Sequence, residues 1–285
     1  MSESYRAIAD LFGTFQPEVR TDVKPLQQGH NADESDQLGR LSLESGNYSE
    51  AIAHFKHAVN QREPRDISSR LDLAGAYETA DQFPQAFRQY EKALAIRPDS
   101  AEARAGIADL KKRYGKFRDS IDHLIKALEN DPKNAFMNFK LAETLREAGA
   151  PKSAMEFAVN AVVAMPENDY FHFWISELNM QLGNYDEALQ SLRAAVELSP
   201  GDDYYYLRCA VPFWRLGKHA EAIKSIRLAS DLDPTKNLYY GLLEELLRAN
   251  EQFEEADLEV KRASEMDQYD QETVEKLLDE MGIGE

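Results

Sequence analysis

The chain has 285 residues, and its 51 acidic and 33 basic side chains give a formal net charge of −18 at pH 7. This charge argues against nucleic-acid binding, which needs a basic surface to neutralise phosphates, and against anionic membrane surfaces. No apolar run approaches the ~20 residues of a membrane span, so we expect no direct membrane insertion. The first thirty residues lack a signal sequence, and the lone cysteine excludes an internal disulfide, so we expect a cytoplasmic protein.

Residues 1–31 precede the regular part of the chain. Ile8, Leu11, Phe12 and Phe15 lie on one helical stripe, and a polar tract with little periodicity follows from Gln16. We predict an amphipathic segment on a flexible tether. The segment has three possible roles: a cap on the adjoining region, a docking motif for a partner, or an occupant of the protein's own groove.

Alanine then recurs with a period of 34 residues, after one first step of 35. A fixed period of this length indicates one supersecondary unit copied in tandem, so we predict a stacked array rather than a globule with one core. A mostly small column lies seven residues before the alanines and a mostly large apolar column three residues before, which places all three columns on one helix face. The alanines are Ala58, Ala93, Ala127, Ala161, Ala195, Ala229 and Ala263.

Each copy has the pattern of a helix, a tight turn, a second helix and a stop. A turn such as Gly46-Asn47 precedes an aromatic residue such as Tyr48, which begins the second helix. Glycine there supplies the positive φ that ends the first helix. Proline cannot continue a helix, and it closes most copies. The closing prolines are Pro98, Pro132, Pro166, Pro200 and Pro234.

The pattern Leu-Gly…Gly-Asn-Tyr-x-Glu-Ala-Ile…Phe…Ala…Pro of Leu38–Pro64 and its six further copies resemble the tetratricopeptide repeat (TPR). The resemblance implies an all-α fold, a right-handed superhelical solenoid of seven helix-turn-helix repeats with a C-terminal capping helix. Pro64 is displaced by one residue and Gln268 replaces the last proline. We place the repeats at 32–66, 67–100, 101–134, 135–168, 169–202, 203–236 and 237–270.

Residues 271–285 are predicted as the capping helix and a tail. Val274, Leu277, Leu278 and Met281 follow the spacing of one helical stripe, and acidic residues cover the rest. This composition is expected of a solubilising cap on an open array.

The resemblance also implies that the first helix of each repeat lines a concave groove, with positions 2, 5, 9 and 12 of the repeat facing inward. These positions are mostly acidic in repeats one to three and aromatic in repeats four to six. Phe136, Tyr170 and Tyr204 form one column, in which we expect a ladder of rings. Arg146, Met180, Trp214 and Arg248 form a parallel column.

Large aromatic residues with interspersed arginine are typical of binding hot spots. We therefore predict that a peptide or helix of a partner protein binds this groove, chiefly in repeats four to six. For some rings, Phe139 and Phe173 above all, packing between helices is the alternative. The predicted partner-binding residues are Phe136, Phe139, Lys140, Arg146, Tyr170, Phe173, Trp174, Met180, Tyr204, Arg208, Trp214, Arg215 and Arg248.

Motifs for catalysis or cofactor binding are not found in the sequence. His54 and His57 share a helix face with Glu50 one turn earlier, but no third ligand set accompanies them, so we expect no metal site. Cys209 falls in an apolar column, where a buried inert thiol is expected. No phosphate-binding glycine loop or nucleophile motif occurs, so we expect neither an enzyme nor a cofactor.

Two functional hypotheses follow. The leading one is a non-enzymatic adaptor that holds a partner's peptide or helix in the concave groove. The alternative is a structural scaffold that self-associates or joins a larger complex through its ends, its convex face or the N-terminal segment. The sequence names neither the partner nor an oligomeric state.

Overall fold

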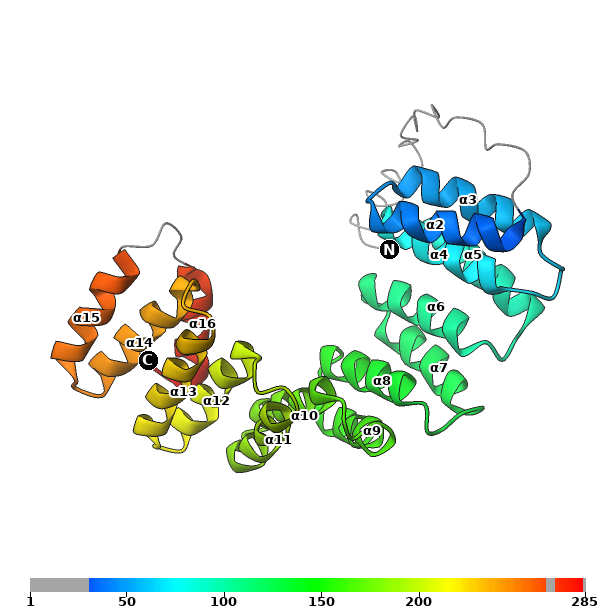
Figure 1. The fold of residues 1–285 in the computed structure, drawn as a ribbon. Helices are drawn as coiled ribbons and strands as arrows, with labels where there is room; N and C mark the ends of the chain where they lie inside the picture. Colours follow the sequence, from blue (N-terminus) through cyan, green and yellow to red (C-terminus); the bar gives the residue numbers. More distant parts are fainter. Residues whose placement is uncertain (1–30, 265–269, 284–285) are drawn as a thin grey trace, which may run out of the picture. The chain divides into compact units, whose positions relative to one another are not determined.

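The computed structural model describes residues 31–264 and 270–283, and every regular element in these stretches is an α-helix (Figure 1). None of these helices is long and apolar enough to cross a membrane. The stripe Ile8–Phe15 lies outside the described residues. The helices up to residue 264 follow in pairs: α2 (Ala32–Glu44) and α3 (Tyr48–Gln61), α4 (Ser68–Thr79) and α5 (Phe83–Ile96), α6 (Ala101–Arg113) and α7 (Phe117–Leu128), α8 (Ala135–Glu147) and α9 (Pro151–Ala164), α10 (Asp169–Gln181) and α11 (Tyr185–Leu198), α12 (Asp203–Arg215) and α13 (His219–Leu232), α14 (Asn237–Ala249) and α15 (Phe253–Ser264).

A final helix, α16 (Gln271–Met281), follows the last pair. The helices fall into two compact lobes, an N-terminal lobe with α2–α5 and a C-terminal lobe with α6–α16. Within each lobe, the two helices of a pair pack on each other, and the second helix of a pair packs on the first helix of the next. Each lobe is therefore built from nearest-neighbour contacts, as expected of a repeat array.

Small side chains let the two helices of each pair approach closely. Ala51 and Ala58 of α3 are fully buried, and so are their counterparts Ala222 and Ala229 of α13. The larger residue between them fills the space against the partner helix, as Phe55 does in α3. The core of the array is thus the same small-large-small face repeated in successive second helices.

The turn inside each pair requires a left-handed backbone residue. Five of the seven turns place a glycine there, such as Gly183 with φ of 78°. Asp81 (φ 55°) and Glu251 (φ 60°) adopt the same conformation without being glycine. Side chains strain this conformation, so these two turns are locally less stable than the glycine turns.

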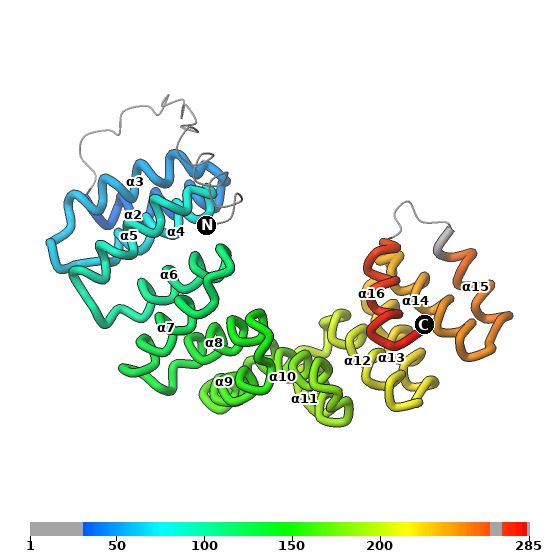
Figure 2. The backbone as a smooth tube through the Cα atoms, turned by 180° about the vertical axis from the view of Figure 1, so that it is seen from behind, coloured from blue at the N-terminus to red at the C-terminus, as the bar shows by residue number. Residues whose placement is uncertain are grey.

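Helix α16 does not pack on the second helix of the last pair in the way that another repeat would. A further repeat would pack on α15, in the way that α4 packs on α3 and α8 packs on α7. Instead, α16 packs against α12 and α14. Both views show α15 and α16 on opposite sides of α14 (Figures 1 and 2). The helix therefore covers the side formed by first helices and leaves α15 without a neighbour beyond it among the described residues.

One residue of α15 explains this position. The apolar residues Ile121, Met155 and Ile223 occupy equivalent positions of α7, α9 and α13, in clusters with the first helix of the next repeat. The equivalent residue of α15 is Asp257, whose carboxylate lies 3.0 Å from Arg248 Nη2. Because burying a carboxylate costs free energy, α15 lacks the apolar contact on which another helix would pack.

The close approach of α2 to α3 predicts opposite effects for two glycine substitutions. A Cβ at Gly39 would lie 2.7 Å from the buried Phe55 ring, whereas one at Gly75 in α4 would meet nothing within 4 Å. We expect Gly39→Ala to destabilise the chain by about 1–3 kcal/mol through overpacking. Gly75→Ala should stabilise it by about 0.5–1 kcal/mol through helix propensity. Urea unfolding of both variants checks this, and a stabilised Gly39→Ala would contradict the packing.

Because Cys209 is buried, we predict that its thiol reacts slowly with disulfide reagents. Burial raises the pKa of Cys209 to about 12, so at pH 8 little thiolate is present in the folded chain. The thiolate is the reactive species, and we expect labelling by a disulfide reagent such as DTNB to be about a thousandfold slower than in the urea-unfolded chain. Absorbance at pH 8 measures both rates. Complete labelling of the native protein within seconds would contradict this burial.

Candidate functional site

Three aromatic rings are exposed on successive first helices of the C-terminal lobe. Phe136 of α8 is 56% exposed, and Tyr170 of α10 and Tyr204 of α12 are each 46% exposed. Each stands in the first turn of its helix, where a side-chain cap fixes the backbone. The caps are Asn134, Asn168 and Asp202, each of which accepts a backbone N–H from the first turn.

The exposed rings are joined by less exposed ones rather than stacked directly on each other. Phe139 of α8 lies 5.5 Å from Tyr170 of α10, measured between ring centroids. Phe173 of α10 lies 5.6 Å from Tyr204 of α12 and is buried. The expected ladder therefore alternates between an exposed ring and a supporting ring of the preceding helix. Phe139 and Phe173 pack between helices, which was the alternative weighed for them.

Two tryptophans predicted in the groove are buried. Trp174 is 6% exposed and lies edge-on to Phe139, with a centroid separation of 5.2 Å. Trp214 is 9% exposed, belongs to the core cluster that includes α16, and stacks on His219 at 4.0 Å. The prediction that the Trp214 column is open to a partner is thus wrong for this ring, because the ring is buried in this cluster.

A hollow of about 490 Å³ lies among α8, α10, α12 and the end of α16. Its wall includes Arg146, Met180 and Arg215 from the predicted set. The Arg146 guanidinium lies 4.2 Å from the centroid of the Trp174 ring, a cation–π contact. Its Nε is buried and has no hydrogen-bond partner among the described residues.

Arg208 holds carboxylates of this chain and is not free for a partner. Its Nε and Nη2 donate to the two carboxylate oxygens of Glu177 at 2.9 and 3.1 Å, and its Nη1 donates to Glu280 of α16 at 2.8 Å. Arg208 is buried. Burial opposes its charge, but the attraction of the two carboxylates raises its pKa above the ordinary value. The predicted partner contact of Arg208 is therefore replaced by an internal one.

Glu177 shows the electrostatic cost of this arrangement. Burial raises its pKa above the usual range, and the nearby Arg208 offsets that only in part. Glu280 adds to the rise because it is a second carboxylate at the same guanidinium. The charge of the nearby Arg146 acts with Arg208 to lower the pKa of Glu177, so the two acids face more than one base.

The other predicted basic residues also hold acidic or carbonyl partners. Lys140 Nζ lies 2.5 Å from an oxygen of Asp109 on α6. Arg215 is exposed, and its Nε donates to the Glu280 backbone oxygen at 2.7 Å, close to the end of α16. Arg248 pairs with Glu244 and Asp257, both at 3.0 Å. Among the predicted arginines and lysines, Arg146 and Arg215 form no ion pair within the part of the chain described here, and Arg215 is held by the backbone oxygen of Glu280.

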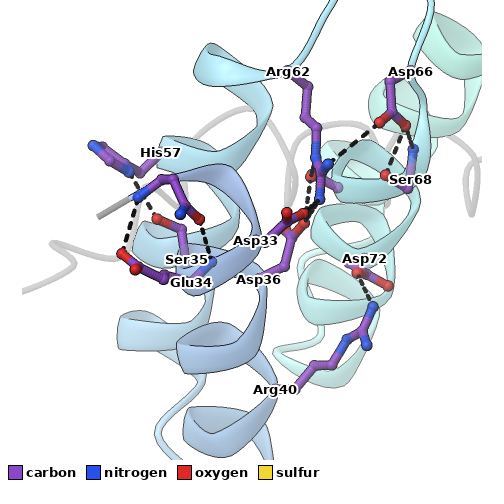
Figure 3. Close-up of polar contacts among 12 residues, drawn as sticks. Asp33, Glu34, Ser35, Asp36, Arg40, His57, Arg62, Asp66, Ser68 and Asp72 are labelled. Carbon is purple, nitrogen blue, oxygen red and sulfur yellow. Dashed lines mark hydrogen bonds and ion pairs between the residues drawn. The ribbon is translucent and has the colours of Figure 1, made fainter. Parts of the chain in front are cut away.

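The acidic residues predicted on the inner side of the N-terminal lobe are bound to basic side chains (Figure 3). Arg62 donates to Asp33 at 2.6 Å and to Asp36 at 2.7 Å, and Asp36 is buried. Arg40 donates to Asp72 of α4 at 3.0 Å. These pairs connect α2, the end of α3, and α4. The two Arg62 pairs lie within the first repeat, and the Arg40–Asp72 pair joins it to the second.

A recurring ion pair could have been found from the sequence. Position 9 of one repeat pairs with position 6 of the next in Asp109–Lys140 and Glu177–Arg208, each 31 residues apart. Arg40–Asp72 is the same pair with the charges reversed, 32 residues apart. Opposite charges at these two positions were visible once the register was fixed. They indicate that charged residues at these positions pair with the neighbouring repeat.

The two histidines of α3 bind protein groups. His57 Nδ1 lies 2.9 Å from Ser35 Oγ, and His54 is buried with its Nε2 3.9 Å from Glu50. Within residues 31–264 and 270–283, no group of three or more potential ligands is placed to hold a metal ion. The groups that this surface offers for binding are aromatic rings, guanidinium groups and other hydrogen-bonding side chains.

Comparison with solved structures shows the fold. A tetratricopeptide repeat protein from Parabacteroides merdae is 18% identical with a TM-score of 0.61, covering 88% of this chain and 98% of that one. PilF of Pseudomonas aeruginosa is 20% identical with a TM-score of 0.59, covering 70% and 93%. YrrB, described as a TPR protein with an unusual peptide-binding site, is 22% identical with a TM-score of 0.52, covering 63% and 92%.

Sequence comparison supplies the family. Superkiller protein 3 of Schizosaccharomyces pombe is 29% identical over 87 residues, which is 30% of this chain but only 6% of that protein. The chain thus matches a small part of this relative's length. Family models described as tetratricopeptide repeat match residues 34–99, 79–140 and 145–211, together more than half of the chain. The chain therefore belongs to the tetratricopeptide repeat family.

Proposed function

We propose that this protein is a non-catalytic adaptor that binds a peptide or short helix of a partner protein on the side formed by α8, α10 and α12. The observation that carries the proposal is the row of exposed rings, Phe136, Tyr170 and Tyr204, on three successive helices. Aromatic rings dominate binding energy at protein interfaces, and rings held by neighbouring rings lose little entropy on binding.

Arg146 adds the polar part of this surface. Its Nε is buried without a hydrogen-bond partner among the described side chains, and its guanidinium is held against the Trp174 ring. A partner that places a carboxylate or carbonyl oxygen in the adjoining hollow would meet the Arg146 guanidinium at its wall. The surface therefore favours a segment with apolar anchors and at least one acceptor. The similarity in fold to YrrB, described as having a peptide-binding site, is consistent with a peptide as ligand.

Removing the rings tests the proposal. We expect the triple variant Phe136→Ala, Tyr170→Ala, Tyr204→Ala to lose its partners, with affinity reduced at least a hundredfold if each ring contributes about 1–2 kcal/mol. Affinity purification from the source cells with quantitative mass spectrometry measures the retained partners. Thermal unfolding verifies that the variant is folded, since each ring also contacts a neighbouring ring.

The matched control removes three exposed apolar side chains from the second helices of the same lobe. Val163, Leu198 and Leu232 are 75%, 42% and 45% exposed, and their alanine variant should retain every partner. If the control loses partners and the ring variant retains them, the outer helices are the interface. That result would reject the proposed surface and support a scaffold that binds through its convex face.

A further inference from the structure

Helix α16 makes the contacts that a bound ligand helix would make. Leu277 and Met281 are each 3% exposed and lie in one cluster with residues of α12 and α14. Both α12 and α14 are first helices, the side on which the exposed rings also lie. The cluster members from these two helices include Leu207, Val211, Leu242 and Leu246.

A carboxylate completes the contact. Glu280 accepts from Arg208 Nη1, and its backbone oxygen accepts from Arg215 Nε. Without Glu280, the Nη1 donor of a buried arginine would lose its partner, which costs free energy. The site therefore selects a helix that carries an acid at this position.

The hollow continues beyond the end of α16. Glu280 and Arg208 lie at its wall together with Arg146 and Met180. Gly282, with φ of 76°, ends the helix in a left-handed cap. The helix thus fills part of a longer site, and Arg146 lines the hollow next to the end of α16.

Helix α16 is also short enough to be displaced. It has 11 residues, and isolated helices of this length are marginal in water. Its helical state therefore depends on the contacts with α12 and α14. Its attachment to the same chain gives it an effective concentration of the order of millimolar, which sets the competition that a ligand must overcome.

We propose that α16 is an internal occupant of a helix-binding groove on α12 and α14, and that the partner is an acidic amphipathic segment that displaces it. The segment carries apolar residues at the positions of Leu277 and Met281 and a carboxylate at that of Glu280. It extends past the position of Gly282, so that a second acid reaches Arg146. This inference rests on the proposed function, because it names the class of segment that the same side of the lobe binds.

The test uses the full chain and a labelled peptide with the sequence of residues 270–283. Leu277→Ser with Met281→Ser weakens the internal helix, and fluorescence anisotropy measures peptide binding. We expect this release variant to bind the peptide at least tenfold more tightly than the unmodified chain does. A peptide with Glu280→Gln should bind the release variant at least fivefold more weakly. The matched control, Glu272→Ser with Lys276→Ser, changes exposed residues of the same helix and should bind like the unmodified chain.

Equal binding of the peptide to the release variant and the unmodified chain would overturn the proposal. So would no binding to a release variant whose circular dichroism loses no more than the signal of α16. If that variant is unfolded, hydrogen exchange of the unmodified chain decides. Excess isotope-labelled peptide should speed exchange in α16 while α12 and α14 stay protected, and unchanged exchange in α16 would reject displacement.

The outcome separates this inference from the proposed function. Phe136, Tyr170 and Tyr204 are outside the cluster that holds α16, so their triple variant should still exchange α16 for the peptide. If the peptide binds and the triple variant retains all partners, the aromatic surface is rejected and the α16 groove stands. If the peptide fails to bind and the triple variant loses its partners, the opposite holds.

Discussion

The close packing of two helices through small side chains is the contact on which the remaining structure depends. Ala154 and Ala161 of α9 are fully buried, and the same columns recur in α3, α5, α11 and α13. Replacing either by a larger residue would separate the helices of a pair and shift every contact that the pair makes with the next. The columns set the distance between helices, and the repeat period sets their rotation. Together they determine which side chains face inward.

The position of a residue within its repeat determines both the polar and the aromatic contacts between repeats. Ring pairs such as Phe173–Tyr204 and ion pairs such as Glu177–Arg208 join the same two helices. The tyrosine of the next position, Tyr205, donates to Asp169 at 2.9 Å, 36 residues earlier. Burial and this hydrogen bond raise the pKa of Tyr205, whereas hydrogen bonds from Ser199 and Tyr205 lower that of Asp169. Most inward polar groups therefore serve the array, and Arg146 and the three exposed rings are the groups that we propose for partner binding.

Much of the fold follows from the sequence because its contacts repeat. The predicted helix starts at Tyr48, Phe83 and Tyr185 are the first residues of α3, α5 and α11. The exposure of Phe136 could be predicted for the same reason. The contact of Arg208 with Glu280 could not, since Glu280 belongs to α16 and lies 72 residues further along the chain. Periodicity carries no information about a contact that occurs once. Asp257 was the available signal, because it interrupts an apolar column.

The pair Arg208–Glu280 has a consequence for folding cooperativity. Contacts between neighbouring repeats span 31–36 residues, so helix pairs can form and open with little dependence on distant parts. Arg208 and Glu280 are 72 residues apart and enclose α13, α14 and α15 between them. While α16 is docked, the last two repeats are closed into one loop and should unfold as a single step. If a partner displaces α16, α14 and α15 become a fraying end. The stability of the last two repeats therefore depends on whether α16 occupies the groove.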